Sequence, residues 1–213
     1  MNFEIWHKQT IAKISPPKTE FGLWRNTLLF SLIVFAFSLA YLYIRRGSMS
    51  LFGLNKAFAA TALFLIGLSF ALSGLCYFWN FVDTKIIYRK HLGLSGFGFA
   101  LLHVIVSLFV LPQFPFSYYQ SHLPTFITGL IAIFIFLFMA LISNQYAAHQ
   151  LGGRRWRMLL RVGYLAYFAV ILHFGILKYS EWLKWLATRT PLLPPLSLLG
   201  VIFAVIVILL RLS

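Results

Sequence analysis

The sequence predicts an all-α fold, a six-helix transmembrane bundle with both termini in the cytoplasm. Hydrophobic residues make up 61% of the 213 residues and charged residues only 10%, whereas a soluble domain carries about 25% charged residues. A spanning helix needs about 20 mostly apolar residues. Six stretches of the chain meet this requirement: 24–44, 57–80, 92–111, 124–143, 159–178 and 194–211.

The basic residues predict which way this bundle faces. We expect 1–22 to be a cytoplasmic lead-in and 23–213 to be one membrane domain. If six helices cross the bilayer, the lead-in, the 81–91 and 144–157 loops and the C-terminus share one side, which then holds twelve of the 18 Lys and Arg residues. Positive charge favours the cytoplasm. The net charge of +14 is therefore interpreted as a topology signal and not as a nucleic-acid surface.

Each remaining element is interpreted in the same terms. The lead-in lacks an apolar centre and contains Pro16 and Pro17, so it is not a cleavable signal peptide. The 178–193 segment is a candidate for a short interfacial helix on the outer side. We expect an integral, multi-pass protein of a bacterial inner or plasma membrane.

Two histidines, His103 and His173, lie deep inside apolar stretches. Ionisable residues at membrane depth are expensive to bury and indicate function, and two histidines on separate spans are typical of haem iron ligation. His103 lies 13 residues after Lys90 and His173 lies 12 residues after Arg161. At a rise of about 1.5 Å per residue, the two imidazoles have nearly the same predicted depth.

Small residues share a helix face with each histidine. Gly96, Ala100 and Ser107 fall on the His103 face, and Gly163 and Ala166 fall on the His173 face. These faces predict a slot in which a flat macrocycle could lie. The alternative is that the small residues only let helices pack closely, as in membrane bundles generally.

The other candidate residues carry weaker signals. The remaining histidines lie in loops or termini and are expected to be solvated: His7, His91, His122 and His149. All four acidic residues lie outside the predicted spans, which argues against a carboxylate-driven pump. Arg155 and Trp156, in a basic cluster at 154–157, either cap a helix or hold the phosphates of a nucleotide or flavin, with Trp156 available for stacking.

Two segments resemble the six-transmembrane epithelial antigen of the prostate (STEAP) metalloreductases, members of the ferric reductase-like transmembrane superfamily. RKHLGLSGFGFALLHVIVSLFVLP (89–112) resembles that family's third span, and GYLAYFAVILHFGILKY (163–179) is similar to its fifth. Weaker similarities lie at 23–37 and 54–70. The resemblance implies one b-type haem with His103 and His173 as axial ligands of the iron. It also implies electron flow from NADPH through a cytoplasmic flavin and the haem to extracytoplasmic Fe(III) or Cu(II).

The departures from the family pattern shape the function that we expect. The chain shows no dinucleotide-binding domain, so we expect a separate flavin or NAD(P)H reductase, a bound FAD or FMN near Arg89 and Lys90, or quinol as the donor. His91 replaces the family's usual Gln. The wider superfamily includes the haem subunit of the bacterial methionine sulfoxide reductase system and the two-haem NADPH oxidases. These place further histidines about where Ser117 and Leu160 stand here, so one haem is expected.

The sequence therefore predicts a haem b transmembrane electron-transfer protein, a partner-dependent oxidoreductase that reduces ferric or cupric ions outside the membrane. No catalytic acid or base is assigned. One alternative is a haem subunit that delivers electrons to a periplasmic oxidoreductase. Another is a structural membrane protein without a cofactor. The expected partners are membrane lipid, the electron donor and a metal-ion or protein acceptor, with no nucleic acid; oligomerisation is left open.

Overall fold

The computed structural model describes residues 19–111 and 115–212, and that part of the chain is helical without strands. The all-α prediction is therefore confirmed. The long helices are α2 (Glu20–Arg46), α3 (Leu51–Phe78), α4 (Arg89–Ile105), α6 (Leu123–Ile142), α9 (Gly163–Thr188) and α10 (Leu196–Leu212). The short elements are the 3₁₀ helix η1 (Asn80–Tyr88), the π-helix η2 (Val106–Val110), α5 (Phe116–Ser121), α7 (Gln145–Leu151) and α8 (Gly153–Arg161).

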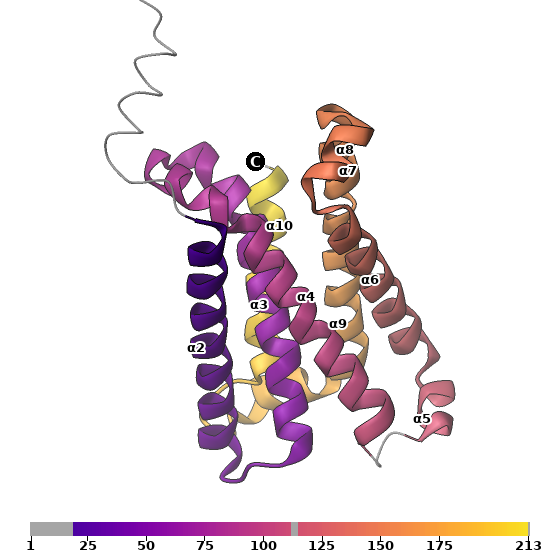
Figure 1. Ribbon diagram of the computed structural model, residues 1–213. Helices are drawn as coiled ribbons and strands as arrows, with labels where there is room; N and C mark the ends of the chain where they lie inside the picture. Colours follow the sequence, from indigo (N-terminus) through magenta and orange to yellow (C-terminus); the bar gives the residue numbers. More distant parts are fainter. Residues whose placement is uncertain (1–18, 112–114, 213) are drawn as a thin grey trace, which may run out of the picture.

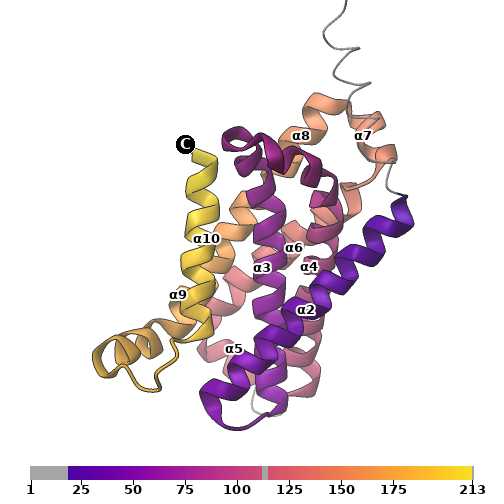
Figure 2. The ribbon, with the colours of Figure 1, turned by 90° about the vertical axis from the view of Figure 1, so that its left-hand side faces the viewer.

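The long helices run alternately up and down in one bundle (Figure 1). The start of α2 and the end of α10 lie at the same end, together with η1, α7 and α8. Helix α3 packs against α2, α4 and α10, while α9 packs against α6 and α10. The last part of α9 turns out from the bundle at the opposite end (Figure 2).

Five helical segments of the described chain are long and apolar enough to cross a membrane, and α10, with 17 residues, is shorter. At about 1.5 Å per residue, α10 spans about 25 Å, slightly less than a hydrocarbon core of about 30 Å. Five of the six predicted spans therefore have the expected length, and the sixth is a shorter helix. The outward faces are apolar, since Ile33 and Phe37 of α2 are 66% and 73% exposed. The chain is a multi-pass α-helical membrane protein.

Several predicted boundaries were wrong because polar caps set the helix ends. Ser50 accepts a hydrogen bond from the Gly53 N–H at 3.1 Å, so α3 begins at Leu51 and not near 57. Thr19 caps Gly22 in the same way at 3.1 Å, so α2 begins inside the predicted lead-in. The 178–193 segment does not form a separate helix, because α9 continues to Thr188.

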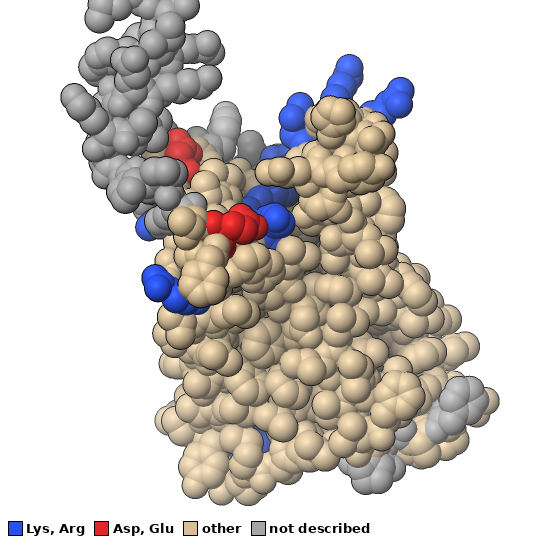
Figure 3. Space-filling model, in the orientation of Figure 1, with Lys and Arg blue, Asp and Glu red and all other residues tan. Residues whose placement is uncertain are grey.

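Lysine and arginine gather at the end of the bundle that carries η1 and α8, and the surface below them in this view shows few Lys, Arg, Asp or Glu side chains (Figure 3). Of the described residues, nine Lys and Arg belong to this end: Arg25, Lys85, Arg89, Lys90, Arg154, Arg155, Arg157, Arg161 and Arg211. Six belong to the other end: Arg45, Arg46, Lys56, Lys178, Lys184 and Arg189. The three lysines of the predicted lead-in lie outside the described residues.

Candidate functional site

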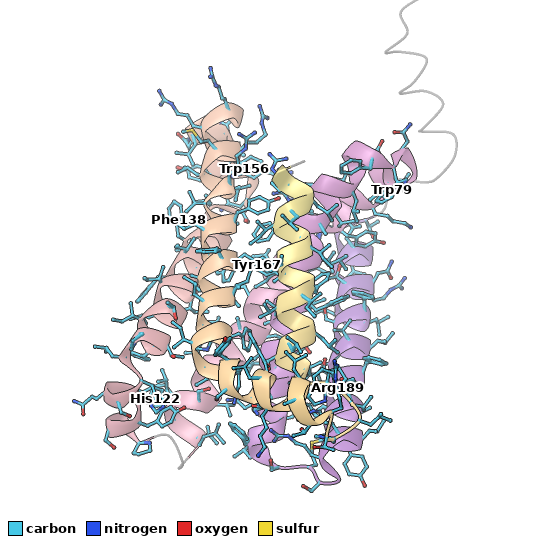
Figure 4. All side chains as sticks on the ribbon, turned by 180° about the vertical axis from the view of Figure 1, so that it is seen from behind. Trp79, His122, Phe138, Trp156, Tyr167 and Arg189 are labelled. Atoms are coloured by element: carbon cyan, nitrogen blue, oxygen red, sulfur yellow. The ribbon has the colours of Figure 1, made fainter. Side chains whose placement is uncertain are left out.

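The bundle brings His103 of α4 and His173 of α9 to the same cavity. This cavity, called the first cavity below, has a volume of about 350 Å³ and is lined mainly by apolar side chains of α3, α4, α6 and α9. Its size falls within the range of cofactor pockets, about 300–1,000 Å³. Tyr167, which also lines it, lies at mid-height in the bundle, whereas His122 lies at the lower end (Figure 4).

Hydrogen bonds fix the ring of His103. Its Nδ1 atom lies 3.1 Å from the side-chain oxygen of Asn55 and 3.2 Å from the Asn55 backbone oxygen. Because both oxygens are acceptors, Nδ1 carries the proton and the lone pair of the neutral ring is on Nε2. The Asn55 amide is itself oriented, since its Nδ2 donates to Ser107 Oγ at 2.8 Å.

The π-helix η2 begins three residues after His103 and completes this network. Ser107 lies in η2, and its backbone oxygen accepts a hydrogen bond from Tyr119 Oη at 2.7 Å. Single π turns inside helices often occur at functional sites. Here the turn lets Ser107 bind Asn55 of α3 through its hydroxyl and Tyr119 of α5 through its backbone oxygen.

His173 has the same proton arrangement. Its Nδ1–H donates to the backbone oxygen of Thr125 at 2.9 Å, which leaves the lone pair on Nε2. Gly129 lies against the ring: a Cβ at this position would be only 2.9 Å from His173 Nδ1 and 3.2 Å from Cε1. A side chain at 129 would therefore displace the imidazole. Within the described residues, neither His103 nor His173 has a hydrogen-bond partner at Nε2.

The predicted small-residue faces separate into two groups. Ala100 lines the first cavity. Gly96 instead lies against α3, where a Cβ would be 2.7 Å from Ile66 Cγ1, and Gly163 lies against Met139 and Phe70. Ala166 is fully buried in the apolar core. Close helix packing, the alternative interpretation, accounts for these last three positions.

A second cavity of about 510 Å³ lies toward the basic end of the bundle. Of the residues predicted to hold a flavin, Arg89, Lys90 and Trp156 line it, while Arg155 does not. Trp156 Nε1 donates to the Ile142 backbone oxygen at 2.8 Å, so the indole also caps the end of α6. Figure 4 shows Trp156 at the end opposite His122.

The prediction that His91 is solvated was wrong. It lies in the first turn of α4, is only 2% exposed and lines the second cavity. Its Nε2 lies 3.1 Å from Glu20 Oε1, and its ring meets Trp24 edge-on at 4.9 Å between centroids. The start of α2 covers this turn, which explains the burial. The other two described loop histidines, His122 and His149, are exposed, and His7 lies outside the described residues.

A thin wall separates the two cavities. Ile66 of α3 and Phe136 of α6 line both of them. Phe70, which lines the second cavity, packs edge-on against Tyr167 of the first at 5.6 Å between ring centroids. The two cavities thus share a layer of apolar side chains.

The supporting residues of the first cavity were missed in the sequence analysis. Asn55 had a usable signal, because it is an amide inside an apolar stretch. Gly129 also lies within an apolar span, but nothing in the sequence pairs it with His173. Thr125 acts through its backbone carbonyl, so its side chain gives no signal at all.

No known family model matches the chain. The sequence is similar to the protein-methionine-sulfoxide reductase heme-binding subunit MsrQ of Azospira oryzae, with 28% identity over 111 residues. The similar part covers 51% of this chain and 44% of the relative, so less than half of that protein is represented. The similarity supports the ferric reductase-like superfamily named above without singling out its STEAP branch.

Proposed function

We propose that this chain is a haem-carrying membrane subunit that moves single electrons across the bilayer. His103 and His173 would hold the iron of one b-type haem in the first cavity. The observation that carries the proposal is the shared geometry of the two imidazoles. Both face one apolar cavity, and both use Nδ1 for a fixed acceptor while Nε2 is left for a metal. The similarity to a heme-binding subunit supports the same cofactor.

The chain's own residues position and tune the ligands. Hydrogen bonds to Nδ1 orient each ring and raise its basicity toward a metal. Gly129 gives His173 the room to face the cavity, and Ala100 keeps the lining beside His103 small. A bound haem would supply one-electron chemistry, with a potential set by these ligands and by the apolar surroundings. The imidazoles are ligands and not acid–base catalysts.

The charge distribution supports a direction for electron flow. We place the basic end of the bundle in the cytoplasm, with 23–213 as the membrane domain of a bacterial inner membrane. The donor then acts at the second cavity. It is a bound flavin, a separate flavin reductase or quinol. Arg89, Lys90 and Trp156 line that cavity, and the exposed Arg155 is available for flavin phosphates or a partner.

The acceptor side lies at the other end of the first cavity. Four basic residues line this end around one carboxylate: Arg45, Arg46, Lys56 and Lys178, with Glu181. Glu181 pairs with Lys178 at 3.2 Å and with Arg45 at 3.8 Å, so positive charge remains in excess. A protein partner outside the membrane is favoured by the relative, whose name is that of a reductase subunit. Anionic ferric or cupric chelates are the second candidate, favoured by this basic rim.

A reduced-minus-oxidised absorption spectrum of the purified protein tests the haem. We expect a Soret band and the α and β bands of a low-spin bis-histidine haem. His103→Ala and His173→Ala should each lose them. His149→Ala is the matched control, because His149 is exposed on α7 and lines neither cavity. Wild-type protein without a Soret band, or a His103→Ala variant with an unchanged spectrum, would contradict the proposal.

Oxidation of the prereduced protein separates the two acceptors. The reduced protein in vesicles is mixed with ferric citrate, and reoxidation is followed at the Soret band. Rapid reoxidation that slows when Lys178 is changed to Gln favours metal reduction. Slow reoxidation by ferric citrate, with an oxidoreductase recovered by copurification that accelerates it, favours a protein acceptor.

A further inference from the structure

The second cavity contains a buried histidine with one nitrogen unused. His91 lines the cavity, and its Nδ1 atom is buried without a hydrogen-bond partner among the residues that the structure describes. Leaving a buried polar atom unpaired is unfavourable, so such an atom beside a cavity indicates a ligand that supplies the missing donor. Its other nitrogen, Nε2, donates to Glu20 Oε1 at 3.1 Å. The neutral ring therefore offers a lone pair at Nδ1.

Glu20 connects this histidine to water. The His91 side chain is 3% exposed, whereas the Glu20 side chain is 62% exposed. Lys90 Nζ lies 3.2 Å from the same carboxylate oxygen and balances its charge. Arg89 is the only other charged residue among those described around the cavity. The pair thus links the second cavity to the aqueous end of the bundle through one imidazole.

The lining indicates which ligand would fit. Its walls are mostly apolar and include the aromatic rings of Phe97, Phe136 and Trp156. A few polar groups gather at the basic end, where Ser143, Asn144 and Gln145 belong to the lining. A mostly apolar cavity with a few placed polar groups is typical of small-molecule sites. A flat aromatic ring with an O–H or N–H donor suits both the walls and the unpaired Nδ1.

We propose that His91 and Glu20 form a proton-accepting pair for such a ring, which is a two-electron donor bound in the second cavity. As the O–H or N–H bond breaks, its proton goes to His91 Nδ1, and the Nε2 proton can pass to Glu20 and then to water. The ring loses two electrons and two protons in all; each proton leaves through the pair. The electrons pass one at a time to a ferric haem, a step that rests on the proposed function.

Two classes of molecule are flat two-electron donors with an O–H or N–H group: hydroquinones and reduced flavins. One probe of each class distinguishes them. Decylubiquinol and reduced FMN are each mixed with the oxidised holoprotein, and haem reduction is followed across pH. His91→Gln keeps a polar side chain but cannot take up a proton. Its rate with the true donor should fall roughly 100-fold, the order expected for general base catalysis, and the pH dependence due to His91 should disappear.

Controls separate proton transfer from structure. Glu20→Gln should slow the same donor, and His149→Gln should not. Dithionite, which requires no proton acceptor, should reduce wild type and His91→Gln equally. Wild-type rates and an unchanged pH profile in His91→Gln would overturn the proposal, as would failure of both probes to reduce the haem.

Binding tests the pair independently of the haem. 2-Heptyl-4-hydroxyquinoline, a flat ring with an O–H or N–H donor, is titrated by calorimetry into the protein as purified, and the Soret band of the same sample is recorded. We expect about 10-fold weaker binding to His91→Leu, because Nδ1 is the ligand's acceptor. Loss of this difference overturns the proton-accepting pair even if the haem is present. A protein that shows the difference but lacks a Soret band overturns the proposed function alone.

Discussion

The two cavities use the same side chain in opposite ways. In the first cavity, His103 and His173 give Nδ1–H to carbonyl oxygens, and Nε2 has no partner within the described part of the chain. In the second, His91 gives Nε2–H to the Glu20 carboxylate, and Nδ1 has no partner within that same part. An amide or peptide oxygen orients a ring but does not take its proton, whereas a carboxylate can. The acceptor behind the ring of His91 therefore allows a proton to pass on, whereas the acceptors behind His103 and His173 only orient those rings.

The residues that accept these hydrogen bonds also differ in their exposure to solvent. Asn55 and Thr125 are almost completely buried, at 2% and 6% exposed, so the acceptors behind His103 and His173 are shielded from solvent. Glu20 is mostly exposed. Yet Ile66 and Phe136 line both cavities. One layer of side chains therefore separates a cavity whose histidine acceptors are buried from a cavity whose histidine acceptor is exposed, a separation that suits electron transfer without proton transfer.

The largest effect is expected from filling the space beside one ligand. Gly129→Val places methyl groups where a Cβ alone would already be 2.9 Å from His173 Nδ1. We expect His173 to turn away and haem incorporation to fall at least 10-fold, measured as the ratio of Soret to protein absorbance. The second cavity should be unaffected, so hydroxyquinoline binding measured by calorimetry should remain.

Gly175→Val is the matched control for this variant. Gly175 lies on α9 two residues after His173, and a Cβ there would meet nothing within 4 Å. Normal haem content in Gly129→Val would show that His173 does not need this space. Loss of hydroxyquinoline binding together with haem would show a general folding defect and would remove the distinction between the cavities.

A smaller effect is expected from removing one acceptor. Asn55→Ala deletes the side-chain oxygen that His103 Nδ1 meets at 3.1 Å, but the Asn55 backbone oxygen at 3.2 Å stays. Loss of a partner behind a metal-bound histidine typically weakens metal binding about 10–100-fold. We expect the lower end of this range, measured as faster haem transfer to apomyoglobin.

Asn26→Ala is the control for the loss of an asparagine amide outside the two cavities. Asn26 binds Tyr88 at 3.2 Å near the basic end and lines neither cavity. Glu20→Gln should also leave haem transfer unchanged, because it alters only the acceptor of His91. Equal haem retention by Asn55→Ala and wild type would mean that the backbone oxygen alone orients His103.

The sequence was sufficient for the apolar helices and for singling out the two histidines, His103 and His173, that line the first cavity. Spans are set by composition over about 20 residues, so apolar runs locate them well. Histidines inside such runs are conspicuous for the same reason. The ends were less predictable, since α3 begins at Leu51 because Ser50 caps it. A single hydroxyl decided that boundary against the hydropathy pattern.

The tertiary partners of the histidines could not be read from sequence. Asn55 lies 48 residues before His103, and Thr125 lies 48 residues before His173. Both contacts depend on how neighbouring helices are rotated, and hydropathy does not determine rotation. His91 was misjudged for a related reason: its place in a predicted loop suggested solvent, but the start of α2 covers it.

The smallest effect is expected at the wall between the cavities. Tyr167 is fully buried, and its Oη donates to the Leu63 backbone oxygen at 3.0 Å. Tyr167→Phe removes this hydrogen bond and keeps the ring that packs on Phe70. Interhelical hydrogen bonds in membranes contribute about 0.6 kcal/mol on average, so the melting temperature in detergent should fall only slightly. Haem content and hydroxyquinoline affinity should stay within about twofold, because the wall keeps its shape.

Tyr167→Ala tests the same wall by removing the ring. Deleting a buried aromatic side chain typically lowers folding stability by about 3–5 kcal/mol. Here the deletion would also open a path between the first and the second cavity. Tyr167→Phe could lose haem while Tyr167→Ala loses little folding stability. That result would show that haem binding depends on the Tyr167 hydroxyl and that the ring contributes little to stability. Tyr167 would then belong to the haem site itself, and the two cavities would not be separated by packing alone.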